Sequence, residues 1–361
     1  MITSSSDCQP ECWCVNRRLK IIRKTTSINK SMKKLSILLL ALCSLALLPG
    51  CGQNGGTPTQ QSTEKKLHLA FVANSAGEYW SIVNLGCETA AQQIGAVAVD
   101  FRFPVESTVA AQQELLTNVV AGGVDGVAVS PIDDASQANL LNEIAGKTLL
   151  VCADSDAATS KRACYIGTDN VAAGKQAADL IKAALPQGGK ILLFVGYANA
   201  QNTKNRVEGI QAGLAGSNIQ IVDTLADGQK SPVAQKNAEN ALVKYPDLAG
   251  MIGISGYHGP ALLAAVSEAQ KTGKVQLVCF DDNSDTLAGI AAGTIYGTIA
   301  QNPFQIGRQT ILQMDKYLRG DKLALSGGKI FTSSRAITKD NIASFIAERK
   351  TIFLHLNDAK Q

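Results

Sequence analysis

The sequence contains few aromatic and few charged residues, and this composition excludes several large classes of protein. Aromatic residues make up 5% of its 361 residues and charged residues 18%, while 45% are apolar. This is the makeup of an ordinary globular protein, and it excludes disordered, collagenous and multi-span membrane chains. At about 100–200 residues per domain, the length predicts two domains, each able to bury a core without disulfides or metals.

A basic excess is missing from the body of the chain. The formal charge is +4, but residues 1–50 hold eight Lys and Arg against two Asp and Glu, and residues 51–361 hold 26 against 28. A nucleic-acid-binding face needs clustered basic residues on the folded part. We therefore expect no nucleic-acid partner.

Sequence motifs of catalysis are also missing. The chain has no G-x-x-x-x-G-K-[ST] and no H-E-x-x-H, and Tyr257 breaks the G-x-S-x-G pattern around Ser255. Asp281 and Asp282 are sequence neighbours, which does not suit two carboxylates flanking one bond. We expect neither catalytic residues nor a metal or cofactor, and we interpret the chain as a non-enzyme.

The cysteines from Cys51 onward lack the C-x-x-C spacing of a metal or redox site. Four of them, Cys87, Cys152, Cys164 and Cys279, lie in apolar surroundings. Cys152 and Cys164 flank a loop between two predicted strands, so a disulfide is one alternative and two buried free thiols are the other. The apolar context favours free thiols.

The first 66 residues are predicted to contain an export signal and a tether. Met32-Lys33-Lys34, the apolar run Leu35–Leu48 and a small residue before Cys51 form a secretory signal. The apolar run has 14 residues, too few to span a bilayer comfortably. Cys51 resembles a lipobox cysteine, and a plain cleavable signal is the alternative. We interpret residues 1–50 as an upstream extension and signal, with translation starting at Met1 or Met32, and 51–66 as a flexible tether. The protein is then exported to the periplasm or cell surface and touches membrane only through its lipid.

From Leu67 onward, short apolar runs alternate with segments of helical period. Strands are predicted at Leu67–Ala73, Ala96–Phe103, Gly126–Ser130, Thr148–Ala153, Ala163–Thr168, Lys190–Gly196, Ile219–Leu225, Gly250–Ser255, Val275–Phe280 and Ile295–Ala300. Helices are predicted at Trp80–Ile94, Thr108–Ala121, Ala172–Leu185, Val207–Ala215, Val233–Tyr245, Pro260–Thr272 and Ile306–Leu318. Ten strands exceed one ordinary parallel sheet, so the pattern predicts an α/β protein with two doubly wound lobes.

Polar residues gather where the predicted strands end. In doubly wound sheets, ligands bind beyond the carboxyl ends of the strands. The residues found there are Asn74 to Trp80, Asp154, the loop 199–206, Asp227, Ser255 to His258, Asp281 and Gln301. These residues include no nucleophile paired with a general base, so the sequence favours a binding function over catalysis.

Several of these residues form an ordered series of short motifs. They are Glu78-Tyr79-Trp80, Ser130-Pro131, Ile166-Gly167-Thr168-Asp169-Asn170, Arg206-Val207-Glu208-Gly209, Phe280-Asp281-Asp282 and Thr298-Ile299-Ala300-Gln301-Asn302-Pro303. In this series the chain resembles the type I periplasmic sugar-binding proteins, the ribose-binding-like substrate-binding lipoproteins of ABC transporters, from about Leu67 to Gly320. The resemblance implies two Rossmann-like lobes joined by a three-strand hinge. It places the crossings near Thr168–Asp169, Gln301–Asn302 and Lys329–Phe331. The N-terminal lobe is then 67–168 plus 302–330, and the C-terminal lobe 169–301 plus 331–361.

The resemblance also implies roles for single residues. Tyr79 and Trp80 would stack on a sugar ring, and Asp154 and Asp281 would accept hydrogen bonds from its hydroxyls. The full set of expected ligand-binding residues is Asn74, Tyr79, Trp80, Asp154, Lys204, Arg206, Asp227, Ser255, Asp281 and Gln301. The alternatives are structural: turn caps for the two aspartates, and a pairing with Glu208 for Arg206.

Two functions fit these expectations. The first is capture of a small sugar or polyol by hinge closure and its delivery to an ABC importer permease by a monomeric protein. The second is a sensory subunit that presents the ligand to a chemoreceptor or a sensor kinase. Both use the same cleft, so uptake of labelled ligand in a deletion strain separates them. Ser155, Lys204 and Ser255 depart from the ribose pattern, which leaves the identity of the sugar open.

Overall fold

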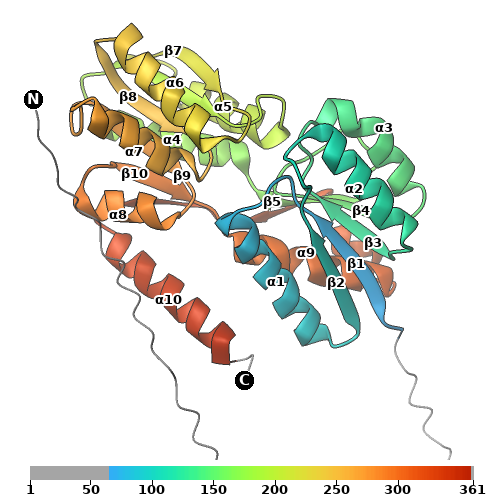
Figure 1. Cartoon of the computed structure of the whole chain (residues 1–361). Helices are drawn as coiled ribbons and strands as arrows, with labels where there is room; N and C mark the ends of the chain where they lie inside the picture. Colours follow the sequence, from blue (N-terminus) through green and yellow to red (C-terminus); the bar gives the residue numbers. More distant parts are fainter. Residues whose placement is uncertain (1–64, 359–361) are drawn as a thin grey trace, which may run out of the picture. The chain divides into compact units, whose positions relative to one another are not determined.

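The computed structural model describes residues 65–358, which form two α/β lobes (Figure 1). The predicted extension, signal and lipidation site at Cys51, and the tether up to residue 64, lie outside the described residues. Among those described, no helix is both long and apolar enough to cross a bilayer.

The first lobe is built on a parallel sheet of six strands. These are β1 (Leu67–Val72), β2 (Val97–Arg102), β3 (Gly126–Val129), β4 (Leu149–Ala153), β5 (Cys164–Thr168) and β11 (Lys329–Thr332), in the order β11-β5-β4-β3-β1-β2. Helices α1 (Glu78–Ile94) and α9 (Pro303–Leu318) cover one face, and α2 (Val109–Ala121) and α3 (Asp134–Ala145) the other. Because both faces are covered, the inner strands read as near-continuous apolar runs.

The second lobe repeats this plan. Its strands are β6 (Gly189–Val195), β7 (Ile219–Ala226), β8 (Leu248–Gly253), β9 (Gln276–Phe280), β10 (Gly297–Ala300) and β12 (Arg335–Thr338), in the order β12-β10-β9-β8-β6-β7, with β12 antiparallel to β10. One face packs against α4 (Asn170–Ala184) and α5 (Gln201–Leu214). The other packs against α6 (Ser231–Lys244), α7 (His258–Glu268), α8 (Ser284–Ala292) and the start of α10 (Ile342–Asp358).

The predicted α/β class with two doubly wound lobes is confirmed, and all ten predicted strands are present, with ends within two residues of the prediction. Helices α3, α8 and α10 were not predicted. The four described cysteines are buried and free, including Cys152 and Cys164 on the neighbouring strands β4 and β5.

The chain passes three times between the sheets. Two passages, from β5 to α4 and from β10 to α9, lie at Thr168–Asp169 and Gln301–Asn302 as expected. The third lies at Ser333–Ser334, so the expected position at Lys329–Phe331 is wrong by a few residues. The reason is that β11 stays in the first sheet and pairs with β5 as far as Thr332.

Matched glycines bring helices close together in each lobe. A Cβ atom on Gly209 of α5 would lie 2.2 Å from the carbonyl oxygen of Val171 on α4. A Cβ on Gly307 of α9 would lie 1.9 Å from the carbonyl oxygen of Val83 on α1. Only glycine allows these contacts. The first contact holds α5, the helix that carries Arg206, close against α4.

Candidate functional site

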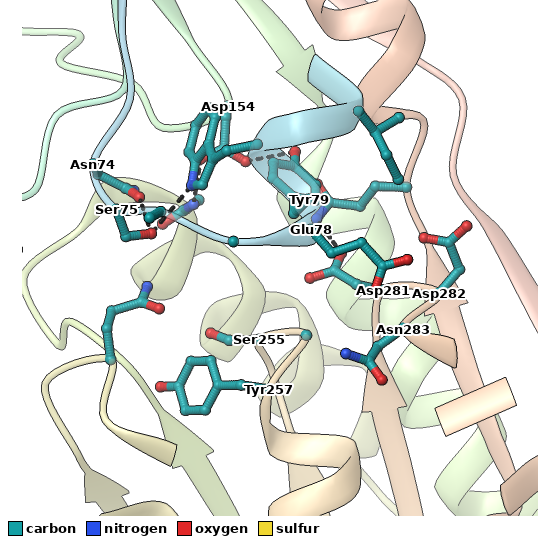
Figure 2. A pocket seen from close by; sticks show the side chains of 18 of the residues that line it. Asn74, Ser75, Glu78, Tyr79, Asp154, Ser255, Tyr257, Asp281, Asp282 and Asn283 are labelled. Atoms are coloured by element: carbon teal, nitrogen blue, oxygen red, sulfur yellow. Dashed lines mark hydrogen bonds between the residues drawn. The ribbon is translucent and has the colours of Figure 1, made fainter. Parts of the chain in front are cut away.

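A cavity of about 290 Å³ lies between the two lobes at the carboxyl ends of the strands. Its walls are the loops after β1, β4, β7, β8, β9 and β10, the first turn of α1 and parts of α5 and α10. Figure 2 shows Asn74 and Ser75, Asp154 with Tyr79, Asp281 to Asn283, and Ser255 with Tyr257 on different walls of this space. This is the position at which doubly wound sheets bind ligands.

Eight of the ten residues expected to bind ligand line the cavity. They are Asn74, Tyr79, Trp80, Asp154, Arg206, Ser255, Asp281 and Gln301. Lys204 and Asp227 are outside the lining. The expected ligand-binding set left out other lining residues. Glu78, Asn202 and Asp282 belong to the strand-end segments and motifs noted in the sequence, whereas Gln229, Asn283 and Arg349 carried no such signal.

Two aspartates occupy equivalent positions in the two lobes. Asp154 follows β4 with a φ of 66°, and Asp281 follows β9 with a φ of 67°. Their backbone N–H groups donate to equivalent carbonyls, of Ile166 and Ile299. A left-handed backbone is unfavourable for aspartate and recurs at functional sites. Here it turns two carboxylates into the cavity from opposite lobes.

Asp154 is held by donors from both lobes. Its carboxylate accepts hydrogen bonds from the Tyr79 hydroxyl at 2.8 Å, the Ser130 hydroxyl at 2.9 Å and the Asn202 amide at 3.3 Å. The dashed line in Figure 2 marks the first of these. Burial raises the pKa of Asp154, opposed chiefly by Arg206. Asn202 lies on α5 of the second lobe, so this carboxylate also connects the lobes across the cavity.

Asp281 keeps one oxygen for the cavity. Gln301 donates to its Oδ1 at 2.6 Å, and Gln301 in turn accepts from the Thr168 hydroxyl at 2.7 Å. Both Gln301 and Thr168 are at passages between the sheets. Burial raises the pKa of Asp281 to about 6, and the Arg206 charge opposes that shift. The hydrogen-bond chain thus fixes Asp281 directly to the hinge.

Arg206 supplies the positive charge between these carboxylates. Its Nε donates to Asn170 Oδ1 at 2.8 Å and its Nη1 to the carbonyl of Ile254 at 2.6 Å, while the guanidinium stacks over Phe280 at 4.6 Å. Its Nη2 is buried and has no hydrogen-bond partner among the described residues. A buried donor without a partner is costly, so an acceptor on a bound molecule would satisfy it.

Trp80 and Tyr79 form the aromatic wall. Their rings meet edge to face at 5.2 Å, and Trp80 also packs against Phe71 at 6.0 Å. The Trp80 indole N–H donates to the Ser75 hydroxyl at 3.1 Å, which fixes the plane of the ring. Trp80 is only 5% exposed, so it belongs to both the core of the first lobe and the cavity wall.

Asp227 supports the cavity wall of the second lobe through hydrogen bonds and is not itself part of the lining. His258 is fully buried, and its Nδ1 accepts from the backbone N–H of Ser255 at 3.0 Å. Its Nε2 therefore carries the proton and donates to Asp227 Oδ2 at 2.7 Å. Asp227 also accepts from the Tyr257 hydroxyl. The side chain of Asp227 thus positions Tyr257, which lines the cavity, and does not itself reach it.

Lys204 points away from the cavity and joins the lobes elsewhere. Its Nζ lies 2.7 Å from Asp134 Oδ1 at the start of α3. Nearby, Asn199 donates to Asp133 at 3.1 Å and the Tyr197 hydroxyl donates to the carbonyl of Ser107 at 2.6 Å. These contacts tie the loop before α5 and the first turn of that helix to the first lobe. Lys204 therefore contacts Asp134 of the first lobe and does not line the cavity, where a ligand contact was expected.

The raised pKa of Asp281 predicts how stability depends on pH. The folded-state pKa of about 6 exceeds the value of 3.8 for an unperturbed Asp, so between these values the folded state holds the extra proton. Stability conferred by that proton is lost as the pH rises through about 4 to 6. Relative to wild type, Asp281→Asn should therefore gain unfolding free energy across this window, by at most about 3 kcal/mol, and stay level above it. Urea unfolding at several pH values measures this, and a difference that does not vary with pH would contradict it.

The similarity of this chain to known proteins is consistent with the two-lobed fold and the cavity between the lobes. Residues 69–322, more than two thirds of the chain, match the family model described as periplasmic binding protein domain. The chain belongs to this family. Its members are substrate-binding proteins of transporters and not enzymes, and this protein is one of them.

Individual relatives cover most of the described residues. The chain is 25% identical over 300 residues to the ribose import binding protein RbsB of Bacillus subtilis (strain 168), covering 81% of this chain and 95% of that protein. It is 28% identical over 242 residues to the D-allose-binding periplasmic protein of Escherichia coli (strain K12), covering 63% and 77%. A solute-binding protein from Burkholderia graminis, solved in complex with D-arabinose, matches with a TM-score of 0.73 at 28% identity, covering 78% of this chain and 98% of that one.

Proposed function

We propose that this protein captures a small sugar or polyol in the cavity between its lobes and delivers it to an ABC importer. The observation that carries the proposal is the pair of carboxylates, Asp154 and Asp281, that face the cavity from opposite lobes with Arg206 between them. A ligand that touches both carboxylates favours the arrangement in which the lobes are together.

The chemistry of the walls suits a sugar. Hydroxyl groups can donate to the carboxylates and accept from the free Nη2 of Arg206, and they can do both at once. The apolar face of a sugar ring can lie against Trp80 and Tyr79. A cavity of about 290 Å³ is at the lower end of the range of ligand sites, which favours a monosaccharide or a polyol of similar size.

The relatives point in the same direction. Ribose import, D-allose binding and a complex with D-arabinose appear among them, and all three ligands are monosaccharides. Import is favoured over a sensory role because the similarity to the ribose import binding protein of Bacillus subtilis covers 81% of this chain. Export through the signal before Cys51, and anchoring through lipid on Cys51, complete the proposal, since the binding protein of an importer works outside the cytoplasmic membrane.

A thermal-shift panel tests the ligand class. The full chain is heated with D-ribose, D-arabinose, D-allose, D-xylose, D-tagatose and xylitol. At 100 times its dissociation constant, a ligand adds about 2.7 kcal/mol of stability, which should raise the melting temperature by about 5 to 10 °C. The Arg206→Ala variant is the control, and the shift should be much smaller in it. If no sugar or polyol moves the melting temperature of the wild type, the proposal fails.

A further inference from the structure

Helix α10 lies beyond the part of the chain that matches the family model, which ends at residue 322. Its first turns are anchored on the second lobe, because Ile342 and Phe345 are buried in that lobe's core. Arg335 of β12 stacks over the Phe345 ring at 4.6 Å and pairs with Glu348 at 2.7 Å. The buried side chains of Ile342 and Phe345 hold the start of the helix in place, and Arg349 follows Phe345 by one helical turn, at the edge of the lobe.

Arg349 contacts residues of both lobes. Its Nη1 donates to the carbonyl of Asp282 at 2.7 Å, and its Nε lies 3.1 Å from Asp282 Oδ2, both within the second lobe. Its Nη2 donates to Glu78 Oε1 at 2.9 Å, in the first turn of α1 of the first lobe. The side chains of Arg349 and Asp282 are only 18% and 13% exposed, so this pair is better shielded from water than an ordinary surface ion pair.

The position of Arg349 connects the binding cavity with the hinge. The residue lines the cavity between the lobes together with Glu78 and Asp282. It also lines a second cavity of about 240 Å³, whose walls include Gln301 and Ser334 at two of the passages between the sheets. Any opening that moves α1 away from α8 and α10 must lengthen or break the bond from Arg349 to Glu78.

We propose that Arg349 is a latch between the lobes, whose bond to Glu78 favours the arrangement with the cavity closed and slows the release of a bound molecule. Asp282 holds the guanidinium in place, and Glu78 is the partner from which it separates on opening. The latch shifts the open and closed populations whatever the ligand is. Only its effect on release rests on the proposed function.

Single-molecule energy transfer on the ligand-free full chain tests this directly. Dyes are placed through azide-bearing amino acids at Leu323 of the first lobe and Val243 of the second, which are 79% and 84% exposed. This chemistry leaves the cysteines unlabelled. Because the Glu78 side chain is 49% exposed, we expect Arg349→Ala and Glu78→Gln each to lower the ratio of closed to open molecules about twofold to fivefold, and the double variant to lower it no further.

The matched control is Glu348→Ala, one residue away on the same helix, which breaks a pair confined to the second lobe. It should leave the ratio unchanged. Unchanged ratios for Arg349→Ala and Glu78→Gln would overturn the latch, and so would an equal loss in Glu348→Ala, because the effect would then come from the helix as a whole. No sugar is needed, so failure of the sugar panel and failure of the latch are separate results.

Discussion

Replacing Arg206 by alanine is expected to weaken sugar binding by at least about 30-fold. The charge of the guanidinium acts on both Asp154 and Asp281, and its buried Nη2 has no hydrogen-bond partner among the described residues. Truncating one member of a buried, hydrogen-bonded charge group costs about 2 to 5 kcal/mol in binding. Titration calorimetry with the sugar that gives the largest thermal shift measures the effect.

Two variants make this test specific. Lys236→Ala removes an exposed ion pair with Glu239 that lies within the second lobe and outside the cavity, so it should change affinity by less than about threefold. Arg206→Lys should bind almost as weakly as Arg206→Ala, because one ammonium cannot reach Asn170, Ile254 and a ligand in the geometry of the planar guanidinium. An Arg206→Ala protein that binds within threefold of wild type would refute the role of Arg206.

Replacing Trp80 by alanine should cost both stability and binding. The side chain is 5% exposed and packs against Phe71 and Tyr79, so its removal leaves a cavity in the first lobe and should lower the free energy of unfolding by about 3 to 5 kcal/mol. It also removes the flat wall against which a sugar ring would lie. Urea unfolding measures the first effect and calorimetry the second.

Milder changes separate these two effects. Trp80→Phe keeps an aromatic ring but loses the hydrogen bond to Ser75 and one ring of the indole, so it should lower stability less than Trp80→Ala and retain most of the affinity. Phe103→Ala removes an aromatic ring that is 53% exposed, and should change stability by less than about 1 kcal/mol. A folded Trp80→Ala protein with wild-type affinity would show that Trp80 belongs to the core alone.

Much of the fold could be predicted because the two sheets are buried on both faces. Their strands read as short apolar runs between amphipathic segments, and this pattern is visible without tertiary information. Helix α3 was missed because its sequence, DASQANLLNEIA, has only a narrow apolar stripe. Helix α8 has nine residues, too few for a periodicity to stand out.

Part of the cavity lining could be predicted from the sequence, because the carboxyl ends of the parallel strands lie at the same edge of each sheet. The rule that ligands bind at strand ends found Asp154, Ser255 and Asp281. It could not tell which way a side chain turns. Lys204 and Arg206 are two residues apart on α5, about 200° around the helix axis, so only one of them faces the cavity.

For other residues, whether the side chain lines the cavity depends on contacts that the sequence does not reveal. Asp227 follows β7, but its carboxylate is taken by Tyr257 and His258. Arg349 reaches the cavity from a helix near the end of the described chain, through a pairing with Glu78 at a separation of 271 residues. No motif marks such a residue, because its role comes from the docking of α10 on the second lobe.

The central claim is that Asp154, Asp281 and Arg206 form one sugar site between the lobes, and titration calorimetry of the wild-type chain tests it most directly. With D-ribose, D-arabinose, D-allose and D-xylose in turn, we expect at least one sugar to bind with one site per chain and a dissociation constant below about 10 μM, equivalent to about 7 kcal/mol. The same sugar should bind at least about 30-fold more weakly to Arg206→Ala. Absence of binding by these four sugars and by D-tagatose and xylitol, or equal binding by the wild type and Arg206→Ala, would contradict the account.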